Sequence, residues 1–542
     1  MKNMFKIKNL FLFLILFSFL SCSSVRDPDN VYSEIDYTQE DARNEEKKRI
    51  FDLLEKNKVQ ALWRAYLLKD GETISQCEEM VLEEYNEAVE KKDWYNALRI
   101  AKSLETLSSP ALAKLSKSPA DLASLSKKNV PGLNGEKSSA AKKVSSYING
   151  TVTIWVDKGI KVERGMGFAD RVIGSGFFIS KDGYIVTNHH VIADLVDKKS
   201  ESFSRLYIKL AEDSDTRIPA KVIGYDPEVD LALIKTEVDA PYVFSLGSSS
   251  DLDAGDKIYA IGSPVGLERT LTSGIVSATD RKLFTLGSVM QIDAAVNQGN
   301  SGGPCIDANG NVQAVVFAGM LQFEGLNFAI PVEYLKSLLP ALFAGGKVSH
   351  PWFGCYGHTK KELGKDAGLE VQYVFPGSSA SRARIIPGDL ITQVDGQNVA
   401  TLEDMQNILM KSAAKSIIRV KYRRGEEEFL ESDIYLAVRP ENPGYNIYKG
   451  DIIAKAFLPI FGMQLVHVST SNSRKYSIEQ ILKGSVADES GFSENDPVEI
   501  RNIRLLEENS VIYAEIYAKN RKKGYLDGVM AIGAQLDSPY YF

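Results

Sequence analysis

Many short runs of alternating apolar and polar residues fill residues 146–345, and closely spaced turn residues separate them. Examples are "GSGFFIS", "GYIVTNH", "LALIKT" and "VQAVVFA", each bounded by Gly, Asp, Asn or Pro. Long stretches with helical spacing do not occur between these runs. Short strands with close turns are typical of antiparallel barrels, in which no strand edge is left unpaired. We therefore predict an all-β barrel domain over residues 146–345.

The chain before this domain has the pattern of a tether and helical domain over residues 23–107. Apolar residues recur at helical spacing from residue 38 onward, and "TQED" has the form of a helix cap. We expect two to four packed helices. One stretch resembles a tetratricopeptide unit, but an ordinary helical hairpin is the favoured interpretation because no repeat follows. Residues 108–145 are rich in Ser, Lys, Ala and Pro, so a linker is predicted there.

Two segments in the last third of the chain resemble each other. "PGSSASRARIIPGDLITQVDG" at 376–396 aligns with "KGSVADESGFSENDPVEIRNI" at 483–503. Each contains a turn of small residues, a short helical pattern, and a second turn that leads into a strand pattern. An internal duplication of this kind predicts two small α+β modules of one type, over residues 350–437 and 455–542.

Residues 1–22 have the pattern of a signal peptide. A start rich in lysine precedes an apolar run that is too short to span a bilayer. The run ends at Cys22 and a Ser-rich polar stretch follows, as in bacterial lipoprotein signals, where the cysteine carries lipid. We therefore predict export to the bacterial cell envelope and attachment to the membrane through Cys22. A plain signal peptide and an unlipidated periplasmic protein are the alternative.

The other cysteines and the charge argue against several classes of function. Cys77, Cys305 and Cys355 are far apart in the sequence, so we expect unpaired buried thiols rather than a disulfide framework. The sequence contains no spacing typical of a metal site, and it implies no cofactor. The net charge of −7, with basic residues scattered among acidic ones, argues against nucleic-acid binding.

The string "NQGNSGGPCID" at residues 297–307 is the first candidate for chemistry. Ser301 lies between Gly299 and a pair of glycines, and glycines permit a sharp turn that lifts a side chain outward. Such a turn also aims the backbone N–H groups of Gly299 and Ser301 at one point, as an oxyanion hole for acyl transfer requires. Taken alone, the string fits a Gly-rich hairpin loop equally well.

A serine nucleophile needs a base, and the base needs a carboxylate that fixes its tautomer. "YIVTNHHVIAD" contains two adjacent histidines, His189 and His190, whose side chains must point in different directions. Asp230 directly precedes an apolar strand pattern, where an isolated acid would be costly to bury. The order His, Asp, Ser on an all-β pattern is that of a chymotrypsin-type triad.

"GYIVTNHHV", "GYDPEVDLALIK", "DAAVNQGNSGGP" and "GLNFAIP" together resemble the trypsin-like serine proteases of the HtrA/Deg family, and the duplicated segments resemble its PDZ modules. The resemblance implies two six-stranded chymotrypsin-like barrels with the active site between them, and a homo-oligomer. In this family the catalytic histidine directly precedes the valine, which selects His190 and leaves His189 facing solvent. The implied site residues are the catalytic His190, Asp230 and Ser301, and the oxyanion-hole residues Gly299, Asn300 and Ser301.

The resemblance also implies a carboxylate-binding loop at "HPWFGCYG", residues 350–357. In such loops, backbone N–H groups bind the C-terminal carboxylate of a peptide that adds as a strand. Trp352, Phe353 and Gly354 occupy the matching positions. Core packing at a domain junction is the alternative for the two aromatic residues. The following helical pattern supplies Leu402, Met405 and Leu409, which we expect in the core rather than in the groove.

We therefore expect an exported serine endopeptidase that cleaves unfolded or damaged envelope proteins. Its PDZ modules would regulate it by binding peptide C-termini. The alternative is a non-catalytic binding or chaperone protein of the same fold. The presence of all three triad residue types favours the enzyme, because a decayed site is expected to lose at least one of them.

Overall fold

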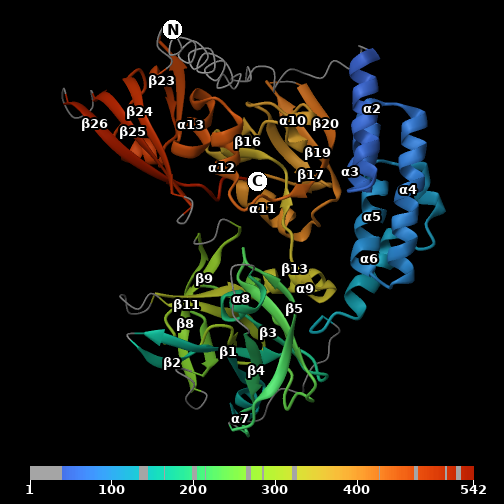
Figure 1. Cartoon of the computed structure of the whole chain (residues 1–542), viewed down its shortest axis with the longest axis vertical. Helices are drawn as coiled ribbons and strands as arrows, with labels where there is room; N and C mark the ends of the chain where they lie inside the picture. Colours follow the sequence, from blue (N-terminus) through green and yellow to red (C-terminus); the bar gives the residue numbers. More distant parts are fainter. Residues whose placement is uncertain are drawn as a thin grey trace, which may run out of the picture. The chain divides into compact units, whose positions relative to one another are not determined.

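Figure 1 draws the computed structural model of the whole chain. The chain divides into two compact units. The structure describes residues 40–542 apart from 134–143, 164, 198–203, 214, 264–269, 283–285, 320–325, 427, 469–473, 507–509 and 521–525. Among these, the smaller unit contains residues 40–44, 373–386 and 442–536, and the larger one contains 45–372, 387–441 and 537–542. The predicted signal peptide, Cys22 and the start of the tether lie outside the described residues. Within the described ranges, none of the helices has the length and apolar character needed to cross a bilayer.

A helical region covers residues 40–128 and confirms the helical pattern of the sequence. It consists of α2 (Glu40–Leu54), α3 (Lys58–Leu68), α4 (Gly71–Glu90), α5 (Trp94–Thr106), the 3-10 helix η2 (Pro110–Lys114) and α6 (Pro119–Lys128). The side chains of Asp70 and Asp93 cap α4 and α5 by accepting backbone N–H bonds. Cys77 and Tyr85 of α4 are fully buried. The helices therefore enclose an apolar core of their own.

The prediction of a linker over residues 108–145 is wrong for its first part, which contains η2 and α6. Ser118 and Asp121 form a capping box at the start of α6. The Ser118 hydroxyl accepts the Asp121 N–H at 3.1 Å, and the Asp121 carboxylate accepts the Ser118 N–H at 3.3 Å. Leu122 is then buried against the preceding helices. Serine is a weak helix former but a strong N-cap, so the Ser-rich composition concealed a helix.

Two six-stranded barrels follow, as predicted, and each is antiparallel. The first contains β1 (Thr151–Glu163), β2 (Met166–Phe178), β3 (Tyr184–Thr187), β4 (Arg205–Lys209), β5 (Ile218–Asp226) and β6 (Leu231–Thr236), and the β5–β6 pairing closes it. The second contains β7 (Lys257–Gly262), β8 (Thr270–Arg281), β9 (Val289–Ile292), β10 (Pro304–Ile306), β11 (Val312–Gly319) and β12 (Asn327–Pro331). The short elements around them are α7 (Val144–Asn149), α8 (His189–Val196), η3 (Ser249–Asp251), α9 (Val332–Ala344) and β13 (Gly346–Lys347).

Three apolar clusters hold the barrels together. One fills the first barrel around Ile154 and Ile234, and another fills the second around Ile292 and Val316. The third contains Phe177 of the first barrel, residues of the second barrel and the leucines of α9, so it lies between the two barrels. Packing at interior density resists small shifts. Side chains from the two barrels can therefore be held at fixed positions relative to one another.

Two smaller modules complete the chain. The first contains β14 (Pro351–Trp352), β15 (Cys355–Glu362), β16 (Lys365–Val374), α10 (Ser379–Arg382), β17 (Leu390–Val394), β18 (Gln397–Asn398), α11 (Leu402–Lys411), β19 (Ile417–Arg424), β20 (Glu428–Tyr435) and β21 (Ala437–Val438). The second contains α12 (Pro443–Gly450), α13 (Ile453–Phe461), β22 (Met463–His467), β23 (Lys475–Ile481), α14 (Val486–Glu489), β24 (Pro497–Leu506), β25 (Val511–Asn520) and β26 (Leu526–Gln535). The main element of the first module is a six-stranded sheet, and that of the second is a five-stranded sheet.

The duplicated segments have matching local structure. Gly377 and Gly484 have φ angles of 72° and 73°, and each precedes a one-turn helix. The modules then diverge, because only residues 507–510 separate β24 from β25, which leaves no room for a counterpart of α11. The predicted range 455–542 is also shifted: α12 begins at Pro443, and residues 537–542 leave the second module for the larger unit.

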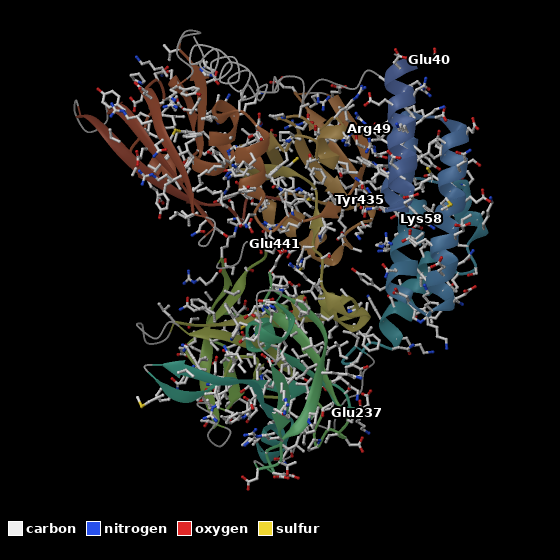
Figure 2. The ribbon with its side chains drawn as sticks, in the orientation of Figure 1. Glu40, Arg49, Lys58, Glu237, Tyr435 and Glu441 are labelled. Atoms are coloured by element: carbon white, nitrogen blue, oxygen red, sulfur yellow. The ribbon has the colours of Figure 1, made fainter. Side chains whose placement is uncertain are left out.

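The helical region packs against the sheet of the first module within the larger unit. The indole N–H of Trp63 donates a 2.8 Å hydrogen bond to the Asp433 carbonyl oxygen on β20. Its ring lies 5.9 Å from that of Tyr435, which Figure 2 labels near Lys58 at the start of α3. Arg99 of α5 donates a further 2.8 Å bond to the Lys415 carbonyl oxygen. This region thus supports the strand layer of the first module.

The thiols are unpaired and buried, as predicted for Cys77, Cys305 and Cys355. Burial raises the pKa of the Cys305 thiol to about 12. A thiol with such a pKa is almost entirely protonated at neutral pH and is a poor nucleophile. These cysteines therefore act as small apolar core residues.

Replacing Ser118 by Ala removes the N-cap of α6, and we expect the helix to open more easily by about 1 kcal/mol. Hydrogen exchange of the α6 amides should become about fivefold faster, because their protection reports this local opening. Ser124→Ala, at an exposed position of the same helix, is the matched control and should leave exchange unchanged or slightly slower. Equal acceleration in both variants would contradict the capping role.

Candidate active site

Ser301 lies in a tight turn that leads into β10 of the second barrel. Gly299 and Gly302 have φ angles of 104° and 85°, which side-chain-bearing residues rarely adopt. The Gly302 N–H donates to the Val316 carbonyl oxygen at 2.7 Å, and the Gly303 N–H donates to the Asn300 carbonyl oxygen at 2.9 Å. The turn is therefore fixed by its own backbone and by β11, and it leaves the Ser301 side chain partly exposed.

Ser175 of the first barrel anchors this turn and was not identified from the sequence. Its N–H donates to the Ser301 carbonyl oxygen at 2.8 Å, and its hydroxyl donates to the Gly299 carbonyl oxygen at 2.6 Å. The Ser175 hydroxyl in turn accepts the Ser263 N–H at 3.0 Å. A Cβ atom on Gly302 would lie 2.2 Å from the Ser175 carbonyl oxygen. The available signal was the Gly-Ser-Gly string, in which the glycines allow such close approach.

The backbone donors of the turn differ in their availability. The Asn300 N–H donates to the Asn297 carbonyl oxygen at 3.0 Å, so it is used inside the turn. In the part of the chain that the structure describes, the N–H groups of Gly299 and Ser301 make no hydrogen bond. Of the three residues predicted for an oxyanion hole, Gly299 and Ser301 thus have N–H groups ready to bind an anion, and Asn300 does not.

His190 and Asp230 form the strongest polar pair near this turn. Nδ1 of His190 lies 2.7 Å from Oδ2 of Asp230, and the His190 backbone N–H donates to Oδ1 at 2.8 Å. Asn188, which precedes α8, donates a 2.8 Å bond from its side chain to the Asp230 carbonyl oxygen. The carboxylate is mostly buried, whereas the imidazole is 47% exposed. The imidazole ring is therefore held through Nδ1, and Nε2 is available to other hydrogen-bond partners.

Asp230 itself has a φ angle of 58°, a left-handed conformation that is costly for a residue other than glycine. Asp226 supports the turn before it by accepting the N–H groups of Glu228 and Val229 at 3.0 and 3.2 Å. The second Asp226 oxygen lies 2.8 Å from Nε2 of His350, and both side chains are almost fully buried. The strained carboxylate position is thus braced by a buried ion pair that the sequence did not indicate.

The expected solvent-facing role of His189 is wrong. Its ring is 8% exposed and stacks on Tyr225 with a centroid distance of 5.5 Å. Nε2 lies 3.4 Å from an oxygen of Asp197. Because α8 starts at this point, His189 turns inward against β5 while His190 turns outward toward Asp230. The two adjacent histidines therefore have separate structural environments.

Ser301 and His190 are not hydrogen-bonded to each other in the described part of the chain. The Ser301 hydroxyl donates to the Phe317 carbonyl oxygen on β11 at 3.2 Å. The turn nevertheless lies against the strand end that leads into α8, since a Cβ atom on Gly302 would be 3.0 Å from the Asn188 nitrogen. Catalytic hydrogen bonds are often absent before substrate binds. The geometry therefore corresponds to a resting arrangement of these groups.

Both aromatic residues of the predicted peptide loop in the first module are buried. Trp352 pairs with Ala437 across β14 and β21, and its ring carries the Arg439 guanidinium at 5.6 Å. Phe353 is fully buried, with its ring 5.5 Å from that of Phe542. Gly354 has a φ angle of 96°. The N–H groups that point out of the loop are those of Gly354 and Cys355, and both donate to the main-chain oxygen of Phe542.

Leu409 on α11 has the buried position that we expected of a core residue. It is buried, but it lines the same small cavity as Tyr541, Phe542 and the neighbouring Gln406. The side of α11 that faces β15 is therefore part of a groove.

Comparison with known families assigns most of the chain to described domains. Residues 174–315 match the trypsin-like peptidase domain, and residues 370–424 match the PDZ domain. Residues 444–536 match the TP0546 family PDZ domain, and residues 41–126 match a domain of unknown function. The first match contains His190, Asp230 and Ser301.

Individual relatives agree with these assignments. A "Probable periplasmic serine endoprotease DegP-like" of Marinomonas sp. is 33% identical over 353 residues, which cover 61% of this chain and 71% of the relative. A protein with the same description from Pseudomonas fulva is 36% identical over 273 residues, or 48% of this chain and 55% of the relative. Among solved structures, the HtrA-type protease AlgW with a tripeptide has a TM-score of 0.46 and 28% identity, covering 55% of this chain and 96% of that one.

Two histidines predict opposite effects of pH on stability. Burial alone would lower the pKa of His350, and the charge of Arg439 acts in the same direction. The charge and hydrogen bond of Asp226 and the charge of Glu228 outweigh both and raise the pKa above its usual value. Its stabilising contribution is therefore complete below about pH 6.5 and is lost as pH rises through the folded pKa. Burial lowers the pKa of His358 to about 4, so its contribution is lost as pH falls from about 6.5 toward 4.

Thermal unfolding at pH 4 to 9 tests this difference. In His350→Gln, the decline in Tm on the alkaline side should be reduced relative to the unchanged protein, because the titrating pair is gone. In His358→Gln, the decline on the acid side should be reduced instead. The same pH profile in both variants would contradict the buried Asp226–His350 pair as the source.

Proposed function

Because this chain belongs to the HtrA/DegP family of serine proteases, we propose that His190, Asp230 and Ser301 are its catalytic triad. The observation that carries the proposal is the 2.7 Å contact between His190 Nδ1 and Asp230 Oδ2 beside the Ser301 turn. The proposed substrates are unfolded or damaged proteins of the bacterial cell envelope. Support comes from the relatives described as periplasmic serine endoproteases. A homo-oligomer remains a prediction from the family resemblance.

In the proposed reaction, the Ser301 oxygen attacks the carbonyl carbon of the scissile peptide, and its proton passes to Nε2 of His190. Asp230 accepts the bond from Nδ1–H, which holds the tautomer with a free Nε2 and stabilises the imidazolium that forms. The carbonyl oxygen becomes an oxyanion, and the N–H groups of Gly299 and Ser301 are placed to stabilise it. His190 then gives its proton to the leaving amine, and water hydrolyses the acyl-enzyme by the same route.

The resting position of the Ser301 hydroxyl requires one change before this reaction. The hydroxyl must leave the Phe317 carbonyl oxygen and turn toward His190. Rotation about a single side-chain bond is fast and needs no shift of the turn, which Ser175 holds in place. We infer that a bound substrate strand favours this rotation by excluding water and supplying the electrophile.

The alternative is a non-catalytic binding or chaperone protein that uses the same fold. It would need neither a strained Asp230 nor free N–H groups beside Ser301. A left-handed conformation costs of order 1–3 kcal/mol, and here the residue that adopts it also holds the His190 ring at 2.7 Å. This observation favours the endopeptidase.

The two histidines test the assignment. Ser301→Ala should abolish covalent labelling by a fluorophosphonate probe, and His190→Ala should lower casein turnover by at least about 10⁴-fold. His189→Ala, the matched control, should change turnover by less than about tenfold, because it removes the contacts with Tyr225 and Asp197 but no group of the proposed triad. A larger loss for His189→Ala than for His190→Ala would overturn the assignment.

Attachment to the membrane through Cys22 is a separate part of the proposal, and its support is the signal pattern in the sequence. The mature protein expressed in a bacterial envelope should enter the detergent phase of a Triton X-114 extract, and Cys22→Ser should move it to the aqueous phase. Mass spectrometry of the mature N-terminus checks the modification. An unmodified N-terminus would support the plain signal peptide instead.

A further inference from the structure

The last residues of the segment Asp537–Phe542 pair with β15 of the first module in an antiparallel arrangement. The Phe542 N–H donates to the Cys355 carbonyl oxygen at 3.0 Å, and the Cys355 N–H returns a 3.0 Å bond to the Phe542 oxygen. The Gly354 N–H donates to the same oxygen at 2.8 Å. Two successive loop N–H groups therefore converge on the main-chain oxygen of one residue. In Figure 1 the C-terminal mark lies beside α11.

Further along the segment, the pairing with β15 continues. Tyr541 forms an antiparallel bridge with Tyr356, and the Gly357 N–H donates to the Tyr540 carbonyl oxygen at 3.2 Å. On the opposite side, the Gln406 side chain of α11 donates a 2.6 Å bond to the Pro539 carbonyl oxygen. The segment thus lies between one strand and one helix, with backbone bonds to both.

The side chains of the segment fill the groove. Tyr541 is 1% exposed and Phe542 is 2% exposed. The Tyr540 ring, which is more exposed, stacks on His358 at a centroid distance of 4.0 Å. Burying an aromatic side chain stabilises the docked segment relative to leaving the ring exposed to water. The groove is therefore built for aromatic residues at the last positions of the segment.

An ion pair anchors the start of the segment outside the groove. Arg439 donates to both carboxylate oxygens of Asp537, at 2.9 and 2.6 Å. The Arg439 side chain is 2% exposed, so this bidentate bond is well shielded from water. The segment is held by main-chain pairing, by two buried rings and by one charge.

We propose that Asp537–Phe542 is an exchangeable ligand that the chain supplies to the peptide groove of its first PDZ module. The proposal rests on the proposed function, in which loop 350–357 binds peptides. Strand addition gives affinity to any extended backbone, and the pocket for Phe542 gives selectivity for an aromatic residue at that position. The groove would therefore take peptides with aromatic residues at the positions of Tyr541 and Phe542.

Covalent attachment gives the segment an advantage over free peptides. A ligand that is tethered to its own binding site acts at a raised effective concentration, because it need not find the site by diffusion. A peptide from another protein must therefore displace the segment, and its apparent affinity falls by the fraction of time that the groove is open. The segment would make the module unresponsive to weak or scarce peptides.

Fluorescence anisotropy with a labelled DSPYYF peptide bearing a free carboxylate tests this on the full chain. A variant with Tyr541→Ala and Phe542→Ala should bind the peptide at least about tenfold more tightly than the unchanged chain, because the internal competitor is weakened. Asp537→Asn should raise affinity by a smaller factor and leaves the groove residues unaltered. Asp251→Asn, which removes an exposed charge from the same unit, is the control and should have no effect.

Two outcomes separate this proposal from the proposed function. Equal binding by the unchanged chain and by both segment variants would show that the segment does not compete, and it would overturn the proposal while the peptide groove stands. No binding by any of the chains, or equal binding of the DSPYYF amide, would overturn the carboxylate-binding groove and the proposal with it. Tighter binding by the Asp537→Asn chain alone would still support competition if the double variant fails to fold.

Discussion

Two hydrogen bonds from Ser175 hold the candidate active site together, because they join the first barrel to the turn that carries Ser301. His190 and Asp230 come from one barrel and Ser301 comes from the other, so their separation depends on how the barrels meet. Apolar packing between the barrels sets this separation approximately. The Ser175 bonds fix it at the level of individual atoms, and Gly302 must lack a side chain for them to form.

The carboxylate side of the site depends on a second buried contact. A left-handed Asp230 would relax if the turn before it were free to move. Asp226 prevents this by accepting two backbone N–H groups, and His350 satisfies the remaining oxygen of Asp226. His350 lies in the junction that follows the protease domain. The position of Asp230 is therefore supported from outside the two barrels.

The parts of this fold that depend on local pattern could be predicted from the sequence. Alternating residues and turn signals marked the barrels, and the glycines around Ser301 marked the turn. Features that depend on distant contacts could not be predicted. His189 is buried because Tyr225 on another strand faces it, and α6 exists because Leu122 packs on helices that precede it. Strand addition by residues 537–542 uses main-chain groups, which every residue has, so it left no sequence signal.

Arg439 also lies 3.6 Å from Glu228, which is part of the turn before Asp230. Burial raises the pKa of Glu228. The positive charges of His350 and Arg439 lower this pKa, and the negative charges of Asp226 and Asp537 raise it further. The docked segment brings the charge of Asp537, which raises the pKa of Glu228. By linkage, the segment must therefore dock more tightly when Glu228 is protonated. Docking of residues 537–542 and protonation of Glu228, two residues before Asp230 in the sequence, therefore favour each other.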